Sequence, residues 1–476
     1  MELKELLNKS GLNCPEGATG IVTGLSYDSR KVEKGHLFFA LKGVHADGHD
    51  FLKEVRSRGA LAAIVERKLP LDLPQIETGS MAETMAKVSD IFFGHPAGRI
   101  PVIGITGTNG KTTTTYLIED LFRAQGKVSG IMGTINYRLG KSIEAAPNTT
   151  PLSIDVQNFI SQALAKGASC VVMEVSSHAL MLHRVDFVKF RVGVFTNLTQ
   201  DHLDFHKDME SYYQAKAKLF QDPETKCVIN LDDPYGERLL KSRPDGLSYG
   251  FSSRAKLRAE NRELSLDGIR FELIFPSGRK AQVSTNLMGE HNIFNCLSAA
   301  GALIAFGVSE GDIVKGLNLP HNVPGRLERI ETGQDFVVVV DFAHTHDALE
   351  KVIKALRQTN PKRILTLFGA GGDRDRTKRP KMGRVATDLS DFVYVTSDNP
   401  RSENPLNIIN DIKSGISTNN YLAIPEREEA IRRIISDARK GDILLLAGKG
   451  HEEYQIIGNT KYPFSDQAMA KKFLGK

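Results

Sequence analysis

The stretch Pro101-Val-Ile-Gly-Ile-Thr-Gly-Thr-Asn-Gly-Lys-Thr-Thr-Thr-Thr115 is the most informative part of this sequence. An apolar, strand-like run leads into glycines and Lys111, and a helix-like pattern with apolar residues at 117, 118, 121 and 122 follows. In a strand-loop-helix segment of this kind, backbone N–H groups face phosphate oxygens and the helix N-terminus favours negative charge. The stretch therefore predicts a phosphate-binding loop in a parallel α/β sheet.

The loop is expected to bind a nucleoside triphosphate and Mg²⁺. Lys111 would reach the β- and γ-phosphates, and the Thr112 hydroxyl would be offered to the metal. Because the glycines fall at 104, 107 and 110, the strict spacing GxxxxGK is not met. The sequence contains no NKxD element, which disfavours a GTPase, whereas the loop alone does not separate a kinase from a ligase. The loop residues expected at ATP are Gly107, Thr108, Asn109, Gly110, Lys111, Thr112 and Thr113.

Length and linkers divide the chain into three predicted domains. A chain of 476 residues has room for roughly three domains of ordinary size. Two stretches punctuated by proline and glycine, 94–101 and 320–325, are typical of linkers. We therefore expect domains over residues 1–98, 99–324 and 325–476.

Short apolar runs alternate with helix-like patterns in the second and third predicted domains. This rhythm is typical of βαβ units and mostly parallel sheets, so the predicted fold class is α/β. Asp267-Gly268 interrupts the rhythm as a plausible hairpin turn. The strands are expected near residues 102–105, 170–175, 192–195, 336–340, 364–368, 392–396 and 443–447.

Composition argues against several classes of protein. No segment approaches the ~20 apolar residues that a membrane span needs, and residues 1–11 resemble a short amphipathic helix, not a signal peptide. The formal charge of +5 is mild, and no run of Lys and Arg predicts nucleic-acid binding. No CxxC pair is present, which favours reduced thiols in the cytoplasm over a metal or disulfide framework. The cysteines are Cys14, Cys170, Cys227 and Cys296.

Acidic and histidine residues follow two strands of the second domain. Glu174 ends an apolar run, where a carboxylate is well placed to hold Mg²⁺, although a plain strand-end charge is the alternative. The spacing in the next cluster matches no zinc site and lacks cysteines, so a histidine-assisted Mg²⁺ site or loop capping is the better interpretation. That cluster is Asp201, His202, Asp204 and His206.

A lysine is expected to face inward from a helix over residues 208–221. Lys216 shares a face with Tyr212, Tyr213 and Phe220, whereas Lys218 points away. Burying an ammonium is costly unless it is paired or neutral. Lys216 is therefore either a lysine whose stem alone is buried or an amine kept uncharged for modification or phosphate contact.

Polar loops follow four strand-like runs of the third domain, at residues 341–347, 369–376, 397–403 and 448–453. Ligands of open parallel sheets bind outside the carboxyl ends of the strands, so the four loops are expected to form one site. Arg374 and Arg401 are suited to holding a carboxylate, and Glu452 to holding an ammonium. A zwitterionic amino acid would need both charges.

Taken together, these motifs resemble the Mur ligase family over essentially the whole chain. The family's motifs occur in order: GTNGKTT at 107–113, MEVSSHAL at 173–180, TNLTQDHLDFH at 196–206, GEHNIFNCLSA at 289–299, PGRLE at 324–328 and DFAHTHDALE at 341–350. The resemblance implies an N-terminal UDP-binding α/β domain, a central P-loop domain and a C-terminal Rossmann-like domain. GGDRDRTKRP and DNPR resemble members that add the third residue of the peptidoglycan stem peptide.

The resemblance also implies a reaction and its participants. ATP would phosphorylate the D-glutamate γ-carboxylate of UDP-N-acetylmuramoyl-L-alanyl-D-glutamate, and meso-2,6-diaminopimelate would attack the acyl phosphate. Lys111, Glu174 and His202 would serve the phosphoryl transfer. Lys216 matches a lysine that the family carbamylates with CO₂, which would give a carboxylate for Mg²⁺. The metal set would be Thr112, Glu174, His202 and Lys216 as its carbamate.

The family's motifs imply three groups of binding residues in this sequence. ATP would also contact Asn292, Arg326 and Asp341. The UDP-muramoyl-dipeptide would contact Ser29, Val44, His45, Ala46, Asn148, Thr149, Thr150, Ser176 and Arg184. Diaminopimelate would contact Arg374, Asp398, Asn399, Pro400, Arg401, Gly448 and Glu452.

Specificity is expected to depend on Arg401, which would pair with the distal carboxylate that lysine lacks. Two positions depart from the family pattern: His346 stands where proline is common, and Leu182 where glutamine often precedes His-Arg-Val. The rivals are another amide ligase of the family, a kinase that only transfers phosphate, and a regulatory nucleotide-binding protein. We expect a cytoplasmic monomer with small-molecule substrates.

Overall fold

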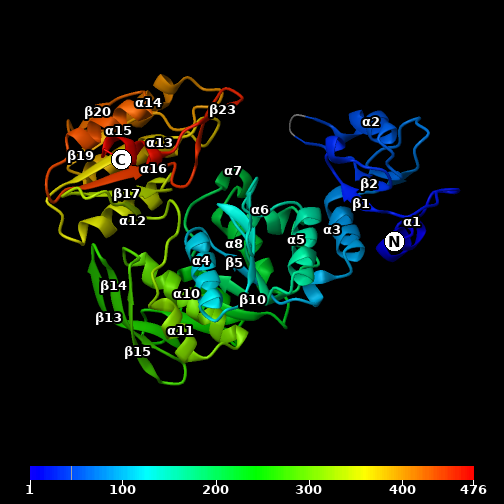
Figure 1. Ribbon diagram of the computed structural model, residues 1–476, viewed down its shortest axis with the longest axis horizontal. Helices are drawn as coiled ribbons and strands as arrows, with labels where there is room; N and C mark the ends of the chain where they lie inside the picture. The colour runs from blue at the N-terminus through cyan, green and yellow to red at the C-terminus, as the bar shows by residue number, and fades with distance from the viewer. Residues whose placement is uncertain (44–45, 476) are drawn as a thin grey trace. The chain divides into compact units, whose positions relative to one another are not determined.

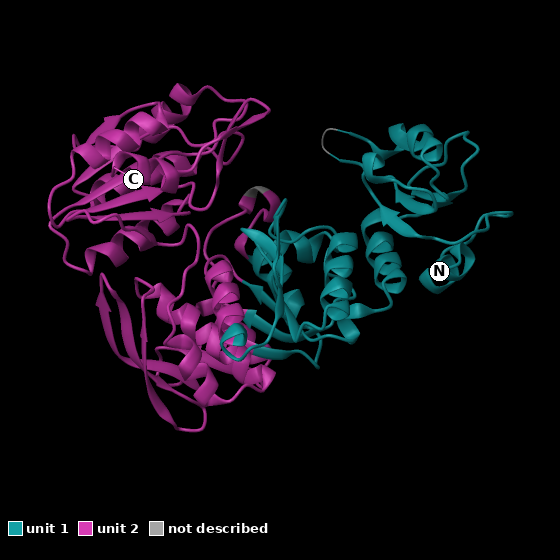
Figure 2. Cartoon of the chain, viewed as in Figure 1, with its two compact units in different colours: residues 1–106, 122–194, 210–227 teal, residues 107–121, 195–209, 228–476 magenta. Residues whose placement is uncertain are grey.

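The computed structural model describes residues 1–43 and 46–475, except the side chain of residue 204. The chain divides into two compact units (Figure 2). Unit 1 comprises residues 1–106, 122–194 and 210–227, and unit 2 comprises residues 107–121, 195–209 and 228–476. Each unit is built from strands and helices in alternation (Figure 1), as the predicted α/β class requires.

The N-terminal part of unit 1 is a four-stranded parallel sheet in the order β1-β2-β3-β4. The predicted amphipathic N-terminal helix is α1 (Leu3–Ser10), which buries three leucines against this sheet. Ile154 of helix α5 belongs to the same core, so the sheet and α5 share one packed interior. The other elements are β1 (Gly24–Ser26), β2 (His36–Phe39), α2 (Leu52–Ser57), β3 (Ala62–Val65), β4 (Gln75–Glu77), α3 (Met81–Phe92) and α5 (Ser153–Ala165).

A second set of strands in unit 1 follows the order β5-β9-β6-β7-β8. β5 and β6 both run parallel to β9, whereas β7 and β8 pair antiparallel at the edge. The predicted buried runs are confirmed, because every residue of β5 and β9 is buried. The elements are β5 (Val102–Thr106), β6 (Ser129–Met132), β7 (Asn136–Leu139), β8 (Ser142–Ala145), β9 (Cys170–Glu174), α6 (Ser177–Met181), β10 (Phe190–Phe195) and α8 (Met209–Ala217).

Unit 2 begins with the phosphate loop and the first turns of α4 (Lys111–Ala124). The predicted hairpin is present, with its turn one residue earlier: Leu266 and Asp267 form the turn, and Gly268 starts the returning strand. A Cβ on Gly268 would lie 1.9 Å from the Thr285 carbonyl oxygen, so close backbone approach explains this glycine. Nearby elements are α7 (Leu203–His206), β11 (Lys226–Asn230), α9 (Pro234–Ser242), β12 (Leu247–Gly250), β13 (Leu257–Ser265), β14 (Gly268–Ile274), β15 (Lys280–Thr285), α10 (His291–Phe306) and α11 (Glu310–Leu317).

The C-terminal part of unit 2 is a six-stranded sheet in the order β16-β17-β21-β18-β19-β20. Only β16 is antiparallel to its neighbour. Its elements are β16 (Glu328–Ile330), β17 (Val337–Asp341), α12 (His346–Arg357), β18 (Ile364–Phe368), α13 (Lys378–Leu389), β19 (Phe392–Val395), α14 (Pro405–Lys413), β20 (Tyr421–Ala423), α15 (Arg427–Ser436), β21 (Ile443–Ala447) and α16 (Asp466–Phe473), with a separate hairpin of β22 (Tyr454–Ile457) and β23 (Thr460–Pro463).

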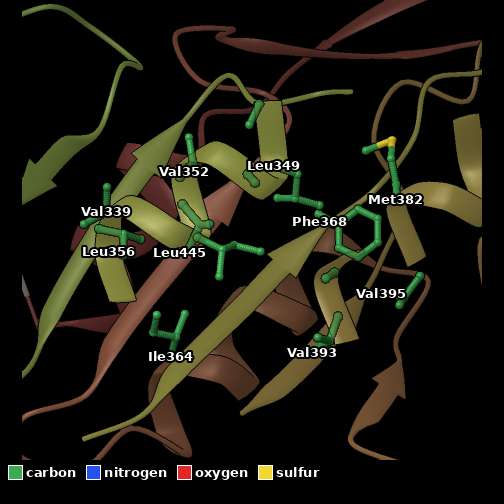
Figure 3. Packing of buried hydrophobic residues seen from close by; sticks show 14 of the residues in the cluster. Val339, Leu349, Val352, Leu356, Ile364, Phe368, Met382, Val393, Val395 and Leu445 are labelled. Carbon is green, nitrogen blue, oxygen red and sulfur yellow. The ribbon is translucent and has the colours of Figure 1, made fainter. Parts of the chain in front are cut away.

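Alternation along the strands explains why this sheet is covered on both faces. Val339 and Leu445 pack with residues of α12, α13 and α14 (Figure 3), whereas Val338 and Leu444, one position away, pack with α15 and α16. Successive strand residues point to opposite faces, so apolar runs without alternation predict burial on both sides. The four polar loops accordingly leave the same edge of a sheet whose central strands β18 and β21 are buried throughout.

No helix among the described residues is long and apolar enough to cross a membrane.

Candidate active site

The phosphate loop of unit 2 is closed by its own lysine. Lys111 starts α4, and its Nζ donates to the carbonyl oxygens of Gly107 and Thr108, each at 2.9 Å. Gly107 and Gly110 have φ angles of +145° and +89°, which side-chain-bearing residues rarely adopt. The strand-loop-helix prediction is therefore confirmed, with the amine held over the loop that would receive the phosphates.

The segment after β10 supports the loop from beneath. Asn109 N donates to Asn197 Oδ1 at 2.9 Å, and Thr108 N donates to Asn197 O at 2.8 Å. The Thr196 hydroxyl donates to Asn109 O at 2.6 Å. A Cβ on Gly107 would lie 1.9 Å from Thr196 Oγ1, so the loop and this segment fit only with glycine. Sequence reasoning missed Thr196 and Asn197, although both belong to the quoted motif at 196–206.

Helix α10 supports the other side of the loop. Asn292 is buried, and its Oδ1 accepts a 2.7 Å bond from Asn295 Nδ2. A Cβ on Gly110 would lie 2.5 Å from Asn295 Oδ1. Asn295 thus lies between Asn292 and the loop, and sequence reasoning missed it as well. Asn295 follows Asn292 by three residues, and this helical spacing would have placed both side chains on one face of α10.

Arg326 connects the linker before β16 to the helix that carries the loop. Its Nη2 donates to Thr112 Oγ1 at 3.3 Å, and its guanidinium lies 4.9 Å from the centre of the Phe342 ring. The Arg326 Nε atom is buried and has no hydrogen-bond partner among the described residues. A buried N–H left unbonded is costly, which suits a group reserved for an anionic ligand.

Asp341 ends β17 and is buried. Its carboxylate accepts from Leu327 N at 2.7 Å and from Ala343 N at 2.8 Å. Burial raises the pKa of Asp341, and the Arg326 charge and these two N–H groups oppose that rise. Asp341 therefore fixes the backbone directly after Arg326 and directly after Phe342.

Unit 1 holds Glu174 in a defined orientation. One carboxylate oxygen accepts from Thr134 N and the other from the Thr134 hydroxyl, both at 2.9 Å. A Cβ on Gly133 would lie 2.5 Å from Glu174 Oε1, so a side chain at this position would displace the carboxylate. Glu174 is buried, and its oxygens are of the type Mg²⁺ prefers.

Three residues predicted to bind the muramoyl-peptide lie together beside Glu174. The Thr150 hydroxyl donates to Glu174 O at 2.8 Å and accepts from Ser176 N at 3.1 Å, and Arg184 Nη1 donates to Thr150 O at 2.8 Å. Burial lowers the pKa of Arg184. Its Nε atom is buried with no partner in the described part of the chain. The arrangement leaves a half-buried cation available to a carboxylate.

The remaining residues predicted for this substrate are more exposed. Thr149 Oγ1 lies 3.1 Å from Thr134 Oγ1, and Asn148 is exposed. Ser29 is buried in a short 3₁₀ helix, and Ala46 is exposed. Val44 and His45 lie outside the described residues. A link that sequence reasoning missed joins this region to α5: the Tyr27 hydroxyl donates to Asp155 at 2.7 Å.

Lys216 is buried on α8 with 2% of its surface exposed, whereas Lys218 is exposed. The Lys216 Nζ lies 4.7 Å from the centre of the Tyr212 ring. The predicted inward orientation is confirmed. The aromatic face of Tyr212 accommodates a lysine amine in its charged or its neutral form.

The C-terminal loops meet at one edge of the sheet, as predicted. Arg401 Nη1 donates to Gly372 O at 2.8 Å, which joins the loop after β19 to the loop after β18. Gly448 N donates to Asp341 O at 3.0 Å, which joins the loop after β21 to that after β17. Burial lowers the pKa of Arg401, and the charge of Arg374 lowers it further. Two arginines that repel one another favour an anion at this position.

The backbone around Arg401 is held by the β22–β23 hairpin. Arg401 has a φ angle of +51°, an unusual value for a residue with a side chain. Arg401 N donates to Ile456 O at 3.1 Å, and Gly458 N donates to Arg401 O at 2.8 Å. The hairpin therefore maintains the conformation that directs this side chain. Pro400 is buried, and Arg374 is exposed.

Asn399 and Glu452 form the polar part of the same site. Asn399 Nδ2 donates to Glu452 Oε2 at 2.8 Å, and Lys449 Nζ donates to Asn399 Oδ1 at 3.1 Å. Burial raises the pKa of Glu452, and the neighbouring Asp398 raises it further. Sequence reasoning also missed Lys449, although it lies directly after the predicted Gly448.

The two departures from the family pattern have simple structural descriptions. His346 is the first residue of α12, and the preceding Thr345 caps the helix by accepting from Ala348 N at 3.2 Å. Proline is favoured at this first position but not required, so the helix starts normally with histidine. Leu182 is exposed beyond the end of α6.

The residues expected around Mg²⁺ are divided between the two units. Unit 1 holds Glu174 and Lys216, and unit 2 holds Thr112 and His202. His202 is exposed just before α7, with its Nε2 3.4 Å from Asp201 Oδ2. A carboxylate and a hydroxyl have the oxygen chemistry that Mg²⁺ prefers. Within the described residues no group of three or more His, Cys, Asp or Glu gathers as a zinc site would require.

Comparison with known families agrees with this architecture. The Mur ligase family catalytic domain model matches residues 21–103, the Mur ligase middle domain model matches residues 105–303, and the glutamate ligase domain model of the Mur ligases matches residues 325–450. The chain belongs to the Mur ligase family, and the predicted ATP-dependent ligase class is confirmed.

Individual relatives narrow the similarity. The chain is 47% identical to a UDP-N-acetylmuramoyl-L-alanyl-D-glutamate--2,6-diaminopimelate ligase of Solibacter usitatus, over 100% of this chain and 98% of that protein. The ligase of the same name from Geobacter metallireducens is 46% identical, over 94% of this chain and 93% of that protein. A solved structure of a ligase with the same name has a TM-score of 0.68 and 32% identity, over 100% of this chain and 98% of that one.

Proposed function

We propose that this protein joins meso-2,6-diaminopimelate to the D-glutamate γ-carboxylate of UDP-N-acetylmuramoyl-L-alanyl-D-glutamate, with ATP cleaved to ADP and phosphate. ATP first phosphorylates the carboxylate. The amine then attacks the acyl phosphate, the new C–N bond forms, and phosphate leaves. Names of relatives over the full length support this substrate pair.

The observation that carries the proposal is the charge pattern of the C-terminal site. Arg401 supplies a cation, and Glu452 supplies an anion that is joined through Asn399 to the same loop. An amino acid with a second carboxylate would place that group at Arg401 and an ammonium at Glu452. Lysine has no group for Arg401, which would then remain half-buried and unpaired.

The ATP site in this proposal consists of the loop with Lys111, together with Asn292, Arg326 and Asp341. Lys111 and Arg326 are the cations available to the phosphates, and their fixed positions avoid reorganisation during transfer. Mg²⁺ held by Thr112, Glu174, His202 and a carbamylated Lys216 would neutralise charge on the transferred group. The burial of Lys216 supports the carbamate, because a neutral amine is the form that reacts with CO₂.

The UDP-muramoyl-dipeptide is assigned to unit 1. Arg184, Thr150 and Ser176 would bind the peptide, with Asn148 and Thr149 beside them. A carboxylate would satisfy the buried Arg184 Nε, which has no partner among the residues that the structure describes. Ser29, Val44, His45 and Ala46 would contact UDP. We further propose domains over residues 1–98, 99–324 and 325–476, a monomeric state, and a cytoplasmic location where ATP and UDP-linked substrates are present.

Amine-dependent phosphate release tests the proposal. The purified chain is supplied with ATP, Mg²⁺ and the UDP-muramoyl dipeptide, and meso-2,6-diaminopimelate, lysine and ornithine are compared as amines. We expect release and a new amide product with diaminopimelate, and far less with the other two. Equal rates with lysine would remove the specificity assignment. ADP formation with a stable phosphorylated product and no consumption of any amine would identify a kinase.

A further inference from the structure

Lys449 has 0% of its side chain exposed and lies at the centre of the amino-acid site. Its Nζ is 3.1 Å from Asn399 Oδ1, 3.2 Å from Glu452 Oε2 and 3.9 Å from Asp398 Oδ1. A buried ammonium persists only where carboxylates and acceptors surround it. Lys449 meets that condition through residues that the proposed function assigns to the incoming amino acid.

The charges of this cluster do not cancel. One lysine serves two carboxylates, Asp398 and Glu452, so the three side chains together carry one excess negative charge. The nearby buried cation Arg427 is already matched by Asp466, with which it forms a buried ion pair. Arg401 and Lys378 also interact electrostatically with these carboxylates, but neither forms an ion pair with them among the described residues. Glu452, the more exposed of the two carboxylates, can therefore present the unmatched charge to a ligand.

Lys449 and the backbone of Ile456 together set which way the Asn399 amide points. Asn399 Oδ1 accepts from Lys449 Nζ and from Ile456 N at 2.9 Å. With two donors on its oxygen, the amide must turn its Nδ2 toward Glu452 Oε2, 2.8 Å away. One Glu452 oxygen thereby accepts from Asn399 and Lys449. The other has no hydrogen-bond donor among the described residues and is available to a ligand.

We propose that Lys449 is a positioning residue: it keeps Asp398 and Glu452 ionised side by side and orients Asn399, so that the cluster offers one unbalanced negative charge to the ammonium of the incoming amino acid. The inference rests on the proposed function. It assigns Lys449 no contact with substrate and no part in phosphoryl transfer.

Without Lys449, Glu452 would face Asp398 with no cation between them. Burial and Asp398 already raise the pKa of Glu452, and the charge of Lys449 is the main influence that opposes this rise. Three other titratable groups interact electrostatically with Glu452: Arg401, Arg427 and Tyr454. Removing the lysine should raise the pKa of Glu452 further, so that the neutral acid prevails at low pH and the carboxylate returns as pH rises.

The test measures steady-state constants of Lys449→Met across pH 7 to 9, beside wild type and Lys440→Met, which removes an exposed lysine of the same domain. We expect the KM for diaminopimelate to rise about tenfold or more at pH 7, the loss expected for an ammonium without its charged partner. The ratio of variant to wild-type KM should shrink as pH rises, whereas the KM for ATP and the values for Lys440→Met should stay within about twofold.

A second variant, Lys449→Met with Asp398→Asn, removes one charge of each sign. Glu452 then has no carboxylate beside it, so the pH dependence of the KM ratio should largely disappear. If Lys449 only fills space, both variants would instead raise all constants by the same factor at every pH, and the proposal would be overturned. Should the single variant fail to fold, a double variant with a raised KM for diaminopimelate and an unchanged KM for ATP supports the proposal, and one in which both constants rise by the same factor overturns it.

The wild-type arm separates this inference from the proposed function. If wild type releases no phosphate in response to diaminopimelate, the proposed function fails first. If wild type responds and Lys449→Met has an unchanged KM for diaminopimelate, the proposed function stands and the role of Lys449 fails.

Discussion

His321 Nδ1 lies 2.7 Å from Asp120 Oδ2, and both side chains are buried. Asp120 belongs to the helix that starts at the phosphate loop, and His321 belongs to the linker that leads to Arg326. Arg326 contacts the same helix at Thr112, so the linker is attached to this helix at two points. His321 is further fixed by reciprocal 2.8 Å bonds between its backbone and the side chain of Asn286.

Replacing His321 by alanine should destabilise the protein, because it removes a buried partner of the Asp120 carboxylate. We expect a loss of about 2–3 kcal/mol in the free energy of unfolding and a higher KM for ATP through displacement of Arg326. Since the chain has no tryptophan, unfolding is best followed by circular dichroism. Lys354→Ala, which breaks only an exposed pair with Glu350, is the control. A midpoint no lower than the control's would contradict a stabilising role.

Arg401→Ala should lose activity with diaminopimelate far more than it loses ATP binding. We expect kcat/KM for diaminopimelate to fall about a hundredfold, because a bidentate partner of the distal carboxylate is lost. The preference over lysine should shrink by a similar factor. Competition between the two amines in the amide-forming assay measures both effects. Arg439→Ala, an exposed arginine of the same domain, serves as the control, and an unchanged preference would argue against the assignment of Arg401.

Lys216→Ala should abolish ligation and recover part of it when short carboxylic acids are added. The physical reason is that a free carboxylate can occupy the position proposed for the carbamate. Lys218→Ala is the matched control, since Lys218 lies two residues away and is exposed. Activity without added acid in Lys216→Ala, at the level of Lys218→Ala, would refute the carbamate. Mass spectrometry of wild type in bicarbonate gives an independent measurement.

Glu403 should contribute to stability in a pH-dependent way. Its hydrogen bond to Arg379 lowers its pKa from 4.5 to about 2. A carboxyl whose pKa is depressed by folding stabilises the protein above its unfolded pKa, and this contribution is lost as pH falls from about 4.5 towards about 2. Glu403→Gln should therefore lower the melting temperature at pH 7 and reduce its fall between pH 5 and pH 3. Parallel curves for variant and wild type would show that the pair contributes nothing in this range.

The ion pair between Glu403 and Arg379 also helps to position the loop that carries Arg401. Arg379 is buried, donates to both Glu403 oxygens and also donates to Gly371 O at 3.2 Å. The pair therefore ties together the two loops that carry Arg401 and Arg374. Such a contact between loops has no signature in the sequence, because the spacing between its partners is set by the sheet order and not by a local period.

Local patterns determined much of this protein. The order of apolar runs predicted the α/β class and the buried strands, the glycine-rich stretch predicted the strand-loop-helix around Lys111, and helical spacing predicted that Lys216 faces inward while Lys218 does not. These features depend on periods of two and 3.6 residues and on the backbone freedom of glycine, all of which can be read from neighbours in the chain.

Only the tertiary structure decided how distant segments meet. It placed Thr196 and Asn197 beneath the phosphate loop, Asn295 between Asn292 and Gly110, and Lys449 among Asp398, Asn399 and Glu452. Strand order brings these residues together, and strand order follows from packing of the whole sheet, not from any local pattern. The burial that gives Lys449 and Glu452 their electrostatic character arises in the same way, since the chain must fold before water leaves them.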